Sequence, residues 1–250
     1  RPFGGRRFDV VIDTQMNVRR SLVARRAAAQ VFVSGAAGGR LSQRPVGELP
    51  DHLVDRLCGL VGAAAGRPCP PRPIELRDPR AAAAANALLP EGRRYVGFAP
   101  GAGGESRRWP LERYLELAAR QPGRGRTPVF LLGPQEAGWA DRIRAAVPEA
   151  LMPELGRTDD FPNVRGPLLA IALAGRLTGA VANDAGPGHM LAAGGAPLLS
   201  LQQHRRKVAK FRPAARRLEM LVAEDYGSAS MDSIPVDAAD ERLEALLTAP

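Results

Sequence analysis

Two loops of this sequence place glycines beside charged side chains in patterns that suit a phosphorylated ligand. The first loop spans 100–110 and reads Pro-Gly-Ala-Gly-Gly-Glu-Ser-Arg-Arg-Trp-Pro. Its glycines allow backbone N–H groups to approach a ligand closely. Arg107 and Arg108 carry guanidinium groups suited to bidentate phosphate contacts. Because the Gly-Lys-Ser/Thr ending of a P-loop is missing, a flexible loop with solvated arginines stays open as the alternative.

The second loop spans 183–189 and reads Asn-Asp-Ala-Gly-Pro-Gly-His. It follows a short apolar run at Gly179–Ala182, which predicts a buried strand, and leads into an expected helix at Pro187–Ala193. Asp184 is then a carboxylate at the carboxyl edge of the sheet, where it suits hydrogen bonds from sugar hydroxyls. The alternative is structural, since an aspartate just before a helix is a common N-cap.

Four further residues near these strand ends suit the same ligand. The backbone N–H groups of Ala185 and Gly186 are offered to a phosphate at a helix start. His189 lies in the first helical turn, where the helix dipole favours neutral imidazole. Glu136 follows another expected strand and either binds a ribose diol or simply suits a helix N-terminus.

Alternating strands and helices must position these loops. Such alternation predicts an α/β fold with a parallel sheet and right-handed crossovers, in which ligands bind beyond the carboxyl ends of the strands. Strands are expected at Phe8–Asp13, Gln30–Ser34, Tyr95–Ala99, Pro128–Leu132, Gly179–Ala182, Ala196–Leu201 and Leu218–Val222. Helices are expected at Asn17–Ala29, Asp51–Val61, Arg80–Leu89, Pro110–Arg120, Gln135–Ala146, Pro167–Ala174, Pro187–Ala193 and Val236–Leu247.

A proline-rich stretch at Gly66–Pro79 predicts a boundary between two domains. It contains five prolines, and no helix tolerates that density. The expected domains are residues 1–72 and residues 73–250. A long surface loop within a single domain is the alternative.

The composition narrows the classes of partner. The net charge of +9 comes almost entirely from arginine, since Lys207 and Lys210 are the only lysines. A basic surface suits a phosphorylated ligand, an anionic membrane face or nucleic acid. No aromatic-interleaved basic module of a nucleic-acid reader occurs, so we expect no specific nucleic-acid partner. No apolar run approaches the roughly 18 residues that span a bilayer.

The cysteines and acidic residues exclude other kinds of site. Cys58 and Cys69 are the only cysteines, so there is neither a disulfide framework nor a cysteine zinc site. We interpret both as reduced thiols of a cytoplasmic protein. Asp159 and Asp160 are adjacent rather than spaced as in a metal-chelating pair, and we expect no metal and no cofactor. His52 and His204 are interpreted as surface residues without a visible partner.

Four segments together resemble one known family over nearly the whole chain. They are Phe8–Gln15 with Ser21 and Leu22, Gly97–Ala102 with Arg107–Tyr114, Val129–Gly133 with Glu136, and Asn183–His189 with Leu191–Ala193. Their order and spacing resemble the ADP-heptose:lipopolysaccharide heptosyltransferases, the family 9 glycosyltransferases of the GT-B fold. The last segment is the most specific of the set.

The resemblance implies a GT-B fold, in which two Rossmann-like parallel-sheet domains face a cleft. Residues 1–72 would be an incomplete, acceptor-side domain, and residues 73–250 the nucleotide-sugar domain. Arg107 stands where the family has a lysine that contacts the donor phosphates. Glu136 would hold the ribose, and Asp184 the ribose or sugar hydroxyls. Ala185 and Gly186 would cradle the diphosphate, with Arg108 and His189 beside it.

The sequence also departs from the family pattern. Ala185 replaces a threonine, and Gln202–Lys207 stands in place of the family's Phe-Gly-Pro-Thr-Asp-Pro. The family's Gly-Asp segment, whose aspartate is the proposed general base, is expected upstream of Arg1. The catalytic residue is therefore unassigned.

By this resemblance we expect an inverting, metal-independent transfer of a heptose from an ADP-sugar. The acceptor would be a lipid-anchored core oligosaccharide at the cytoplasmic face of the inner membrane, with peripheral contact to anionic lipid. A non-catalytic member that binds a nucleotide sugar is the alternative. A dinucleotide oxidoreductase is disfavoured, because no Gly-x-Gly-x-x-Gly follows a strand.

Overall fold

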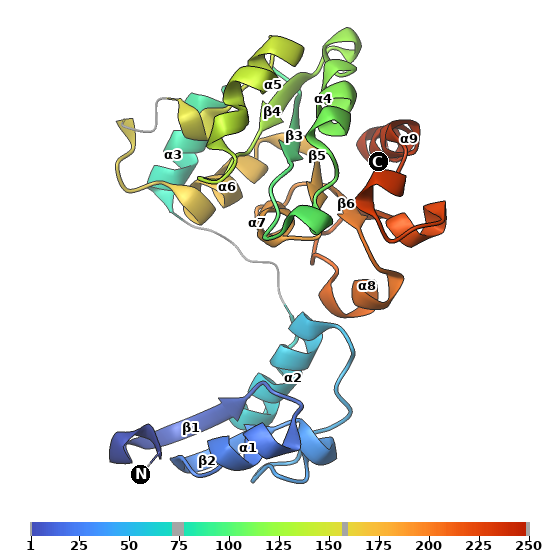
Figure 1. The fold of residues 1–250 in the computed structure, drawn as a ribbon. Coiled ribbons are helices and arrows are strands. Elements are labelled where there is room, and N and C mark those ends of the chain that lie inside the picture. Colours follow the sequence, from blue (N-terminus) through green and yellow to red (C-terminus); the bar gives the residue numbers. More distant parts are fainter. Residues whose placement is uncertain (1, 72–77, 157–159, 249–250) are drawn as a thin grey trace. The chain divides into compact units, whose positions relative to one another are not determined.

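A computed structural model of the chain describes residues 2–71, 78–156 and 160–248 (Figure 1). The chain divides into two compact units. The first comprises Arg1–Arg72 with Ala209–Phe211, and the second comprises Pro73–Val208 with Arg212–Pro250. Of the expected domain boundary at Gly66–Pro79, residues 72–77 lie outside the described residues. No helix in the described ranges combines the length and apolar character that a membrane-spanning segment needs.

The first unit is built on a two-stranded parallel sheet. Its elements are β1 (Arg7–Asp13), α1 (Val18–Ala24), β2 (Ala28–Ser34) and α2 (Leu53–Ala65). Leu60 of α2 is fully buried together with Val33 of β2, so the helix covers the strands. The helix ends at Gly66, whose φ of 69° is a left-handed conformation that glycine adopts without strain.

A buried polar cluster closes the carboxyl end of this small sheet. The Asp13 carboxylate accepts hydrogen bonds from the hydroxyls of Ser21 and Ser34, the latter at 2.8 Å. The single helix expected at Asn17–Ala29 is wrong, because α1 ends at Ala24 and Ala28 already pairs with β1. Parallel pairing overrides the helix propensity of the alanines there.

The second unit contains a five-stranded, entirely parallel sheet in the order β4-β3-β5-β6-β7. Its strands are β3 (Tyr95–Ala99), β4 (Thr127–Phe130), β5 (Leu177–Asn183), β6 (Leu198–Gln202) and β7 (Leu218–Val222). All five residues of β3 and of β6 are buried. Burial on both faces explains why these strands read as continuous apolar runs rather than alternating ones.

Helices cover both faces of this sheet (Figure 1). One face is packed by α3 (Pro79–Leu88), α6 (Gly166–Ala174) and α7 (Gly186–Ala193). The other is packed by α4 (Leu111–Ala119), α5 (Ala140–Ala146) and α9 (Val236–Thr248). Phe98 and Phe130 stack at 5.3 Å toward the α4 side, while Tyr95 and Val129 face the opposite side, as the two-residue period of strands requires.

The helices that follow β4 and β6 differ from expectation. The helix expected at Gln135–Ala146 begins only at Ala140, after a single 3-10 turn at Ala137–Trp139 that contains Gly138. The basic run after β6 forms a helix, α8 (Arg205–Phe211), which the sequence did not predict. Its cationic side chains repel one another and give no apolar stripe, so its formation depends on contacts outside the helix.

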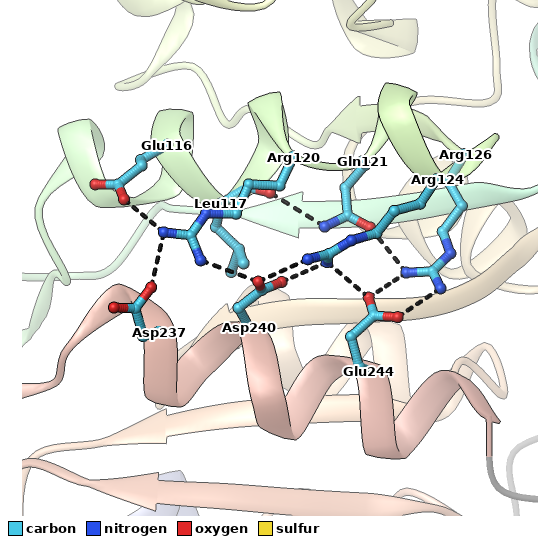
Figure 2. A network of polar contacts seen from close by, with 9 residues as sticks. All are labelled: Glu116, Leu117, Arg120, Gln121, Arg124, Arg126, Asp237, Asp240 and Glu244. Carbon is cyan, nitrogen blue, oxygen red and sulfur yellow. Dashed lines mark hydrogen bonds and ion pairs between the residues drawn. The ribbon is translucent and has the colours of Figure 1, made fainter.

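An ion-pair network joins α9 to α4 and to the turn after it (Figure 2). Asp240 accepts hydrogen bonds from Arg120 at 2.9 Å and from both terminal nitrogens of Arg124 at 2.6 and 2.8 Å. Glu244 accepts from Arg126 at 2.7 Å and from Arg124 at 2.9 Å. Because only 12% of the Asp240 side chain is exposed, this network is screened less by solvent than a surface ion pair.

Replacing Asp240 with alanine is expected to lower the free energy of unfolding by about 2–3 kcal/mol, since two arginines lose a mostly buried partner. Asp237 is a matched control: it pairs with the same Arg120 at 2.8 Å, but 88% of its side chain is exposed. Asp237→Ala should cost less than about 0.5 kcal/mol. Urea denaturation measures both, and equal losses would contradict the assignment.

The effect of Asp240 should also depend on pH. Hydrogen bonds from Arg124, then from Arg120, hold the pKa of Asp240 below its ordinary value of 3.8. A carboxyl group whose pKa falls on folding stabilises the protein above its unfolded pKa and loses that contribution as the pH falls through its folded pKa. The difference between wild type and Asp240→Ala should therefore be full at neutral pH and shrink below about pH 3.8.

Candidate functional site

The predicted loops meet at one edge of the five-stranded sheet. β4, β3, β5 and β6 are consecutive neighbours and all run in the same direction. The segments that follow them, 131–136, 100–110, 184–186 and 203–204, therefore emerge side by side. This is the edge at which open parallel α/β sheets bind ligands.

The buried amide of Asn183 ties the glycine-rich loop to this edge. Its Oδ1 accepts a hydrogen bond from the Trp109 N–H at 3.0 Å, and its Nδ2 donates to the Pro100 carbonyl at 2.8 Å. Both ends of the loop 100–110 are thus fixed by one side chain with no exposed surface. Trp109 is anchored further, because its indole N–H donates to the Ile234 carbonyl at 3.0 Å.

Arg108 is held by the protein itself. Its guanidinium donates twice to the Ala102 carbonyl, at 3.1 and 3.2 Å, and lies 3.4 Å from Oε1 of Glu136. It also lies over the Trp139 ring at 5.5 Å from the centroid. The phosphate contact predicted for Arg108 would have to be made by a guanidinium that already has these partners.

Glu136 lies in a space that two glycines leave open. It is 6% exposed, and a Cβ at Gly133 would lie 2.7 Å from its Oε2. A Cβ at Gly101 would lie 3.0 Å from its carboxyl carbon. Glycine at both positions therefore lets the carboxylate rest between the β3 and β4 loops. Glu136 is placed at the predicted edge, with one oxygen engaged by Arg108.

Arg107, in contrast, is exposed and has no ion pair within the described residues. It belongs to a short 3-10 turn, Glu105–Arg107, and folds back over the glycines, since a Cβ at Gly103 would lie 3.2 Å from its Nη2. Its positive charge lowers the pKa of Asp184, so the two groups are within electrostatic reach. Arg107 is therefore the cation of this loop that remains available for an anionic ligand.

Asp184 is not the N-cap of α7. The N-cap is Ala185, and no side chain makes a capping hydrogen bond there. Asp184 is half-buried, and burial raises its pKa, while His189, Lys207, Arg107 and a hydrogen bond from Gln202 act in the opposite direction. A half-buried carboxylate at a strand end, surrounded by cations and without a capping role, is typical of a binding site.

The start of α7 offers fewer backbone donors than predicted. The Ala185 N–H already donates to the Asn183 carbonyl at 2.7 Å. Of the two predicted amides, that of Gly186, the first residue of the helix, remains for a ligand. Gly188 lets the helix approach the strand end, because a Cβ there would lie 3.0 Å from the Asn183 carbonyl oxygen. His189 is exposed in the first turn, near Asp184.

Glu154, which no sequence pattern indicated, also lies at this edge. Leu151 forms a parallel bridge with Val129 of β4, and this bridge brings the following segment alongside the strand. Burial raises the pKa of Glu154 to about 7, a hydrogen bond from the Leu132 N–H lowers it, and the nearby Glu136 carboxylate raises it. No sequence motif marks Glu154, because its position at this edge depends on the bridge between Val129 and Leu151, which are distant in sequence.

The turn after β6 is a second part of this edge that the sequence motifs did not indicate. Gln203 Nε2 donates to the Ser106 carbonyl at 3.3 Å, which links this turn to the glycine-rich loop. The expectation that His204 has no partner is wrong, since its Nδ1 lies 2.8 Å from Glu224. His52 likewise lies 3.1 Å from Asp55.

No group of three or more His, Cys, Asp or Glu side chains in the described residues is placed to hold a metal ion. Asp159, one of the adjacent acidic pair considered in the sequence, is outside the described residues.

Comparison with known proteins identifies the family. The model of glycosyltransferase family 9 (heptosyltransferase) matches residues 1–233. The chain belongs to glycosyltransferase family 9. No curated protein sequence matches it significantly.

Solved structures of family 9 proteins share the fold of this chain. Escherichia coli heptosyltransferase WaaC with ADP is 18% identical with a TM-score of 0.67, covering 96% of this chain and 73% of that one. Escherichia coli ADP-heptose lipopolysaccharide heptosyltransferase II is 20% identical with a TM-score of 0.62, and the match covers 96% of this chain and 76% of that one. A family 9 glycosyltransferase from Veillonella parvula is 18% identical with a TM-score of 0.66, and the match covers 96% of this chain and 73% of that one.

These matches confirm the family predicted from the four motifs, and the α/β fold class of parallel GT-B type. Family 9 proteins are glycosyltransferases, so the predicted enzyme class is confirmed at the level of the family.

Proposed function

We propose that this family 9 chain binds an ADP-linked heptose at the carboxyl edge of the five-stranded sheet and transfers the sugar to a lipopolysaccharide-type acceptor. The observation that carries the proposal is the convergence of the exposed Arg107, the half-buried Asp184 and the first turn of α7 on one edge. A cation and helix amides suit a diphosphate, and a carboxylate suits hydroxyl groups. Residues 73–250 are accordingly the donor-binding domain.

The diphosphate is the leaving group, and negative charge grows on it as the bond to the anomeric carbon breaks. Arg107 and the Gly186 N–H stabilise that charge, and preorganised groups of this kind lower the barrier. Because these groups supply the positive charge, transfer needs no metal. Inversion at the anomeric carbon is what the family resemblance implies. Glu136, oriented by Arg108, accepts hydrogen bonds from the ribose hydroxyls.

The acceptor is a lipid-anchored glycan, and residues 1–72 form the domain that binds it. These residues contain twelve arginines, no lysine and five acidic residues, and so carry +7 of the net charge of +9. That excess suits the phosphates of the acceptor and an anionic membrane face. The enzyme acts in the cytoplasm, peripherally at the inner membrane.

Asp184→Asn tests the assignment. Because Asp184 makes no capping hydrogen bond, the amide should leave the melting temperature within about 2 °C of wild type, the scale of a few tenths of a kcal/mol. It should weaken binding of the ADP-sugar about tenfold, since a carboxylate acceptor becomes an amide that also presents donors. Thermal melts and calorimetric titration measure both. An Asn variant that binds donor as tightly as wild type would defeat the proposed role.

A member of the family that binds the donor without turnover is the second candidate. The feature that favours it is the replacement of the family's Phe-Gly-Pro-Thr-Asp-Pro segment by Gln202–Lys207. Release of ADP from an ADP-heptose in the presence of acceptor separates the two functions, because a binding protein retains the intact donor.

A further inference from the structure

The basic helix α8 begins beside the carboxyl edge of the five-stranded sheet. Its first turn is held by residues outside the helix. Glu224 holds its first turn, accepting from the Arg205 N–H at 2.9 Å and lying 2.8 Å from His204 Nδ1. Arg205 also pairs with Asp225. On the opposite side of the turn, Gln203 donates to the Ser106 carbonyl of the glycine-rich loop at 3.3 Å. The first turn of α8 is therefore fixed relative to the loop that carries Arg107.

Lys207 is the cation of α8 that lies within electrostatic reach of the site. It is half-buried, whereas Arg205, Arg206 and Lys210 are exposed. Asn183 is paired with Leu201 across the two strands, so Asp184 and Gln202 lie at adjacent strand ends. Lys207 lies close enough to Asp184 for its charge to lower the pKa of that carboxyl group.

This edge carries two cations from different segments, Arg107 and Lys207. Both lie close enough to Asp184 for their charges, like that of His189, to lower the pKa of its carboxyl group. No acidic side chain within the described residues forms an ion pair with either cation. Both cations therefore remain available for a diphosphate, whose negative charge also suits the Gly186 amide at the start of α7.

We propose that Lys207 of α8 is a second cationic contact for the donor diphosphate, in addition to Arg107. This inference rests on the proposed function, since it assumes that an ADP-sugar occupies the edge. It gives a role to the segment in which this chain departs from the family pattern. The negative charge of the diphosphate is then neutralised by two segments, the loop after β3 and the helix α8 after β6.

Calorimetric titration of wild type, Lys207→Ala and Lys210→Ala with ADP and AMP tests the inference. Lys210 is the matched control, because it lies on the same helix with its ammonium group over the Phe211 ring at 4.9 Å. Lys207→Ala should weaken ADP binding about tenfold or more and AMP binding less, since AMP lacks the second phosphate. Lys210→Ala should bind ADP like wild type, and Lys207→Arg should restore most of the affinity lost in Lys207→Ala.

The outcomes separate two failures. A wild-type chain that binds neither ADP nor an ADP-sugar contradicts the proposed function itself. A wild-type chain that binds ADP, with Lys207→Ala binding it equally well, overturns the role of Lys207 alone. Equal losses in the Lys207 and Lys210 variants would show a general effect of charge and would also overturn it.

Chemical labelling gives an independent readout, because Lys207 and Lys210 are the only lysines. The aldehyde of pyridoxal 5′-phosphate condenses with a lysine amine to an imine, releasing water, and borohydride reduces the imine to a stable secondary amine. We expect labelling at Lys207 that ADP suppresses, and labelling at Lys210 that ADP leaves unchanged. Peptide mapping that finds Lys207 labelled equally with and without ADP would contradict the inference.

Discussion

Asn183→Ala is expected to lower the free energy of unfolding by about 2–4 kcal/mol and to abolish measurable ADP binding. The variant leaves the Trp109 N–H and the Pro100 carbonyl without their partner, and each unsatisfied buried polar group costs about 1–3 kcal/mol. It also frees both ends of the loop that carries Arg107. Urea denaturation and ADP titration measure the two effects.

Asn86 provides the matched control for this substitution. It is an exposed asparagine on α3, and Asn86→Ala should change the free energy of unfolding by no more than about 0.5 kcal/mol. ADP binding by that variant should equal that of wild type. An Asn183→Ala variant as stable as wild type and still able to bind ADP would contradict the role of Asn183 as the clamp of the loop.

Local sequence patterns predicted most of the second unit because its central strands are buried on both faces. Tyr95–Ala99 and Leu218–Val222 are strands with the predicted bounds, although only the first is buried throughout and the second is half-buried over its first three residues. Short apolar runs of this kind have few alternatives in an α/β sequence. The loops after them could therefore be placed at one edge before any side-chain position was known.

The details of the site could not be predicted, because they depend on contacts distant in sequence. Arg108 and Glu136 are 28 residues apart, and Asn183 reaches Trp109 across 74 residues. Glu154 depends on the bridge between Val129 and Leu151. No local pattern reports such pairings.

Two sequence alternatives were decided by geometry. Asp184 matched an N-cap as well as a ligand-binding carboxylate, and only the position of Ala185 at the cap shows that it is not the former. The arginines of the glycine-rich loop looked equivalent, yet Arg108 contacts Ala102 and Glu136 whereas Arg107 is exposed. In both cases hydrogen-bond partners, not residue type, distinguish the roles.

Arg107→Ala is expected to weaken ADP binding about ten- to a hundredfold. The loss of a charge-assisted phosphate contact costs about 1.5–3 kcal/mol, which corresponds to that change in affinity. Stability should change little, because Arg107 is exposed and has no ion pair within the described part of the chain. Arg93 is the matched control, since it is also exposed but lies before the amino end of β3, at the opposite edge of the sheet.

The central claim is that the nucleotide donor binds at the carboxyl edge of the five-stranded sheet, and calorimetric titration of ADP into wild type, Arg107→Ala and Arg93→Ala tests it most directly. The account predicts saturable binding to wild type, an unchanged affinity in Arg93→Ala, and a loss of about ten- to a hundredfold in Arg107→Ala. Equal ADP affinity in all three proteins, or an equal loss in both variants, would contradict it.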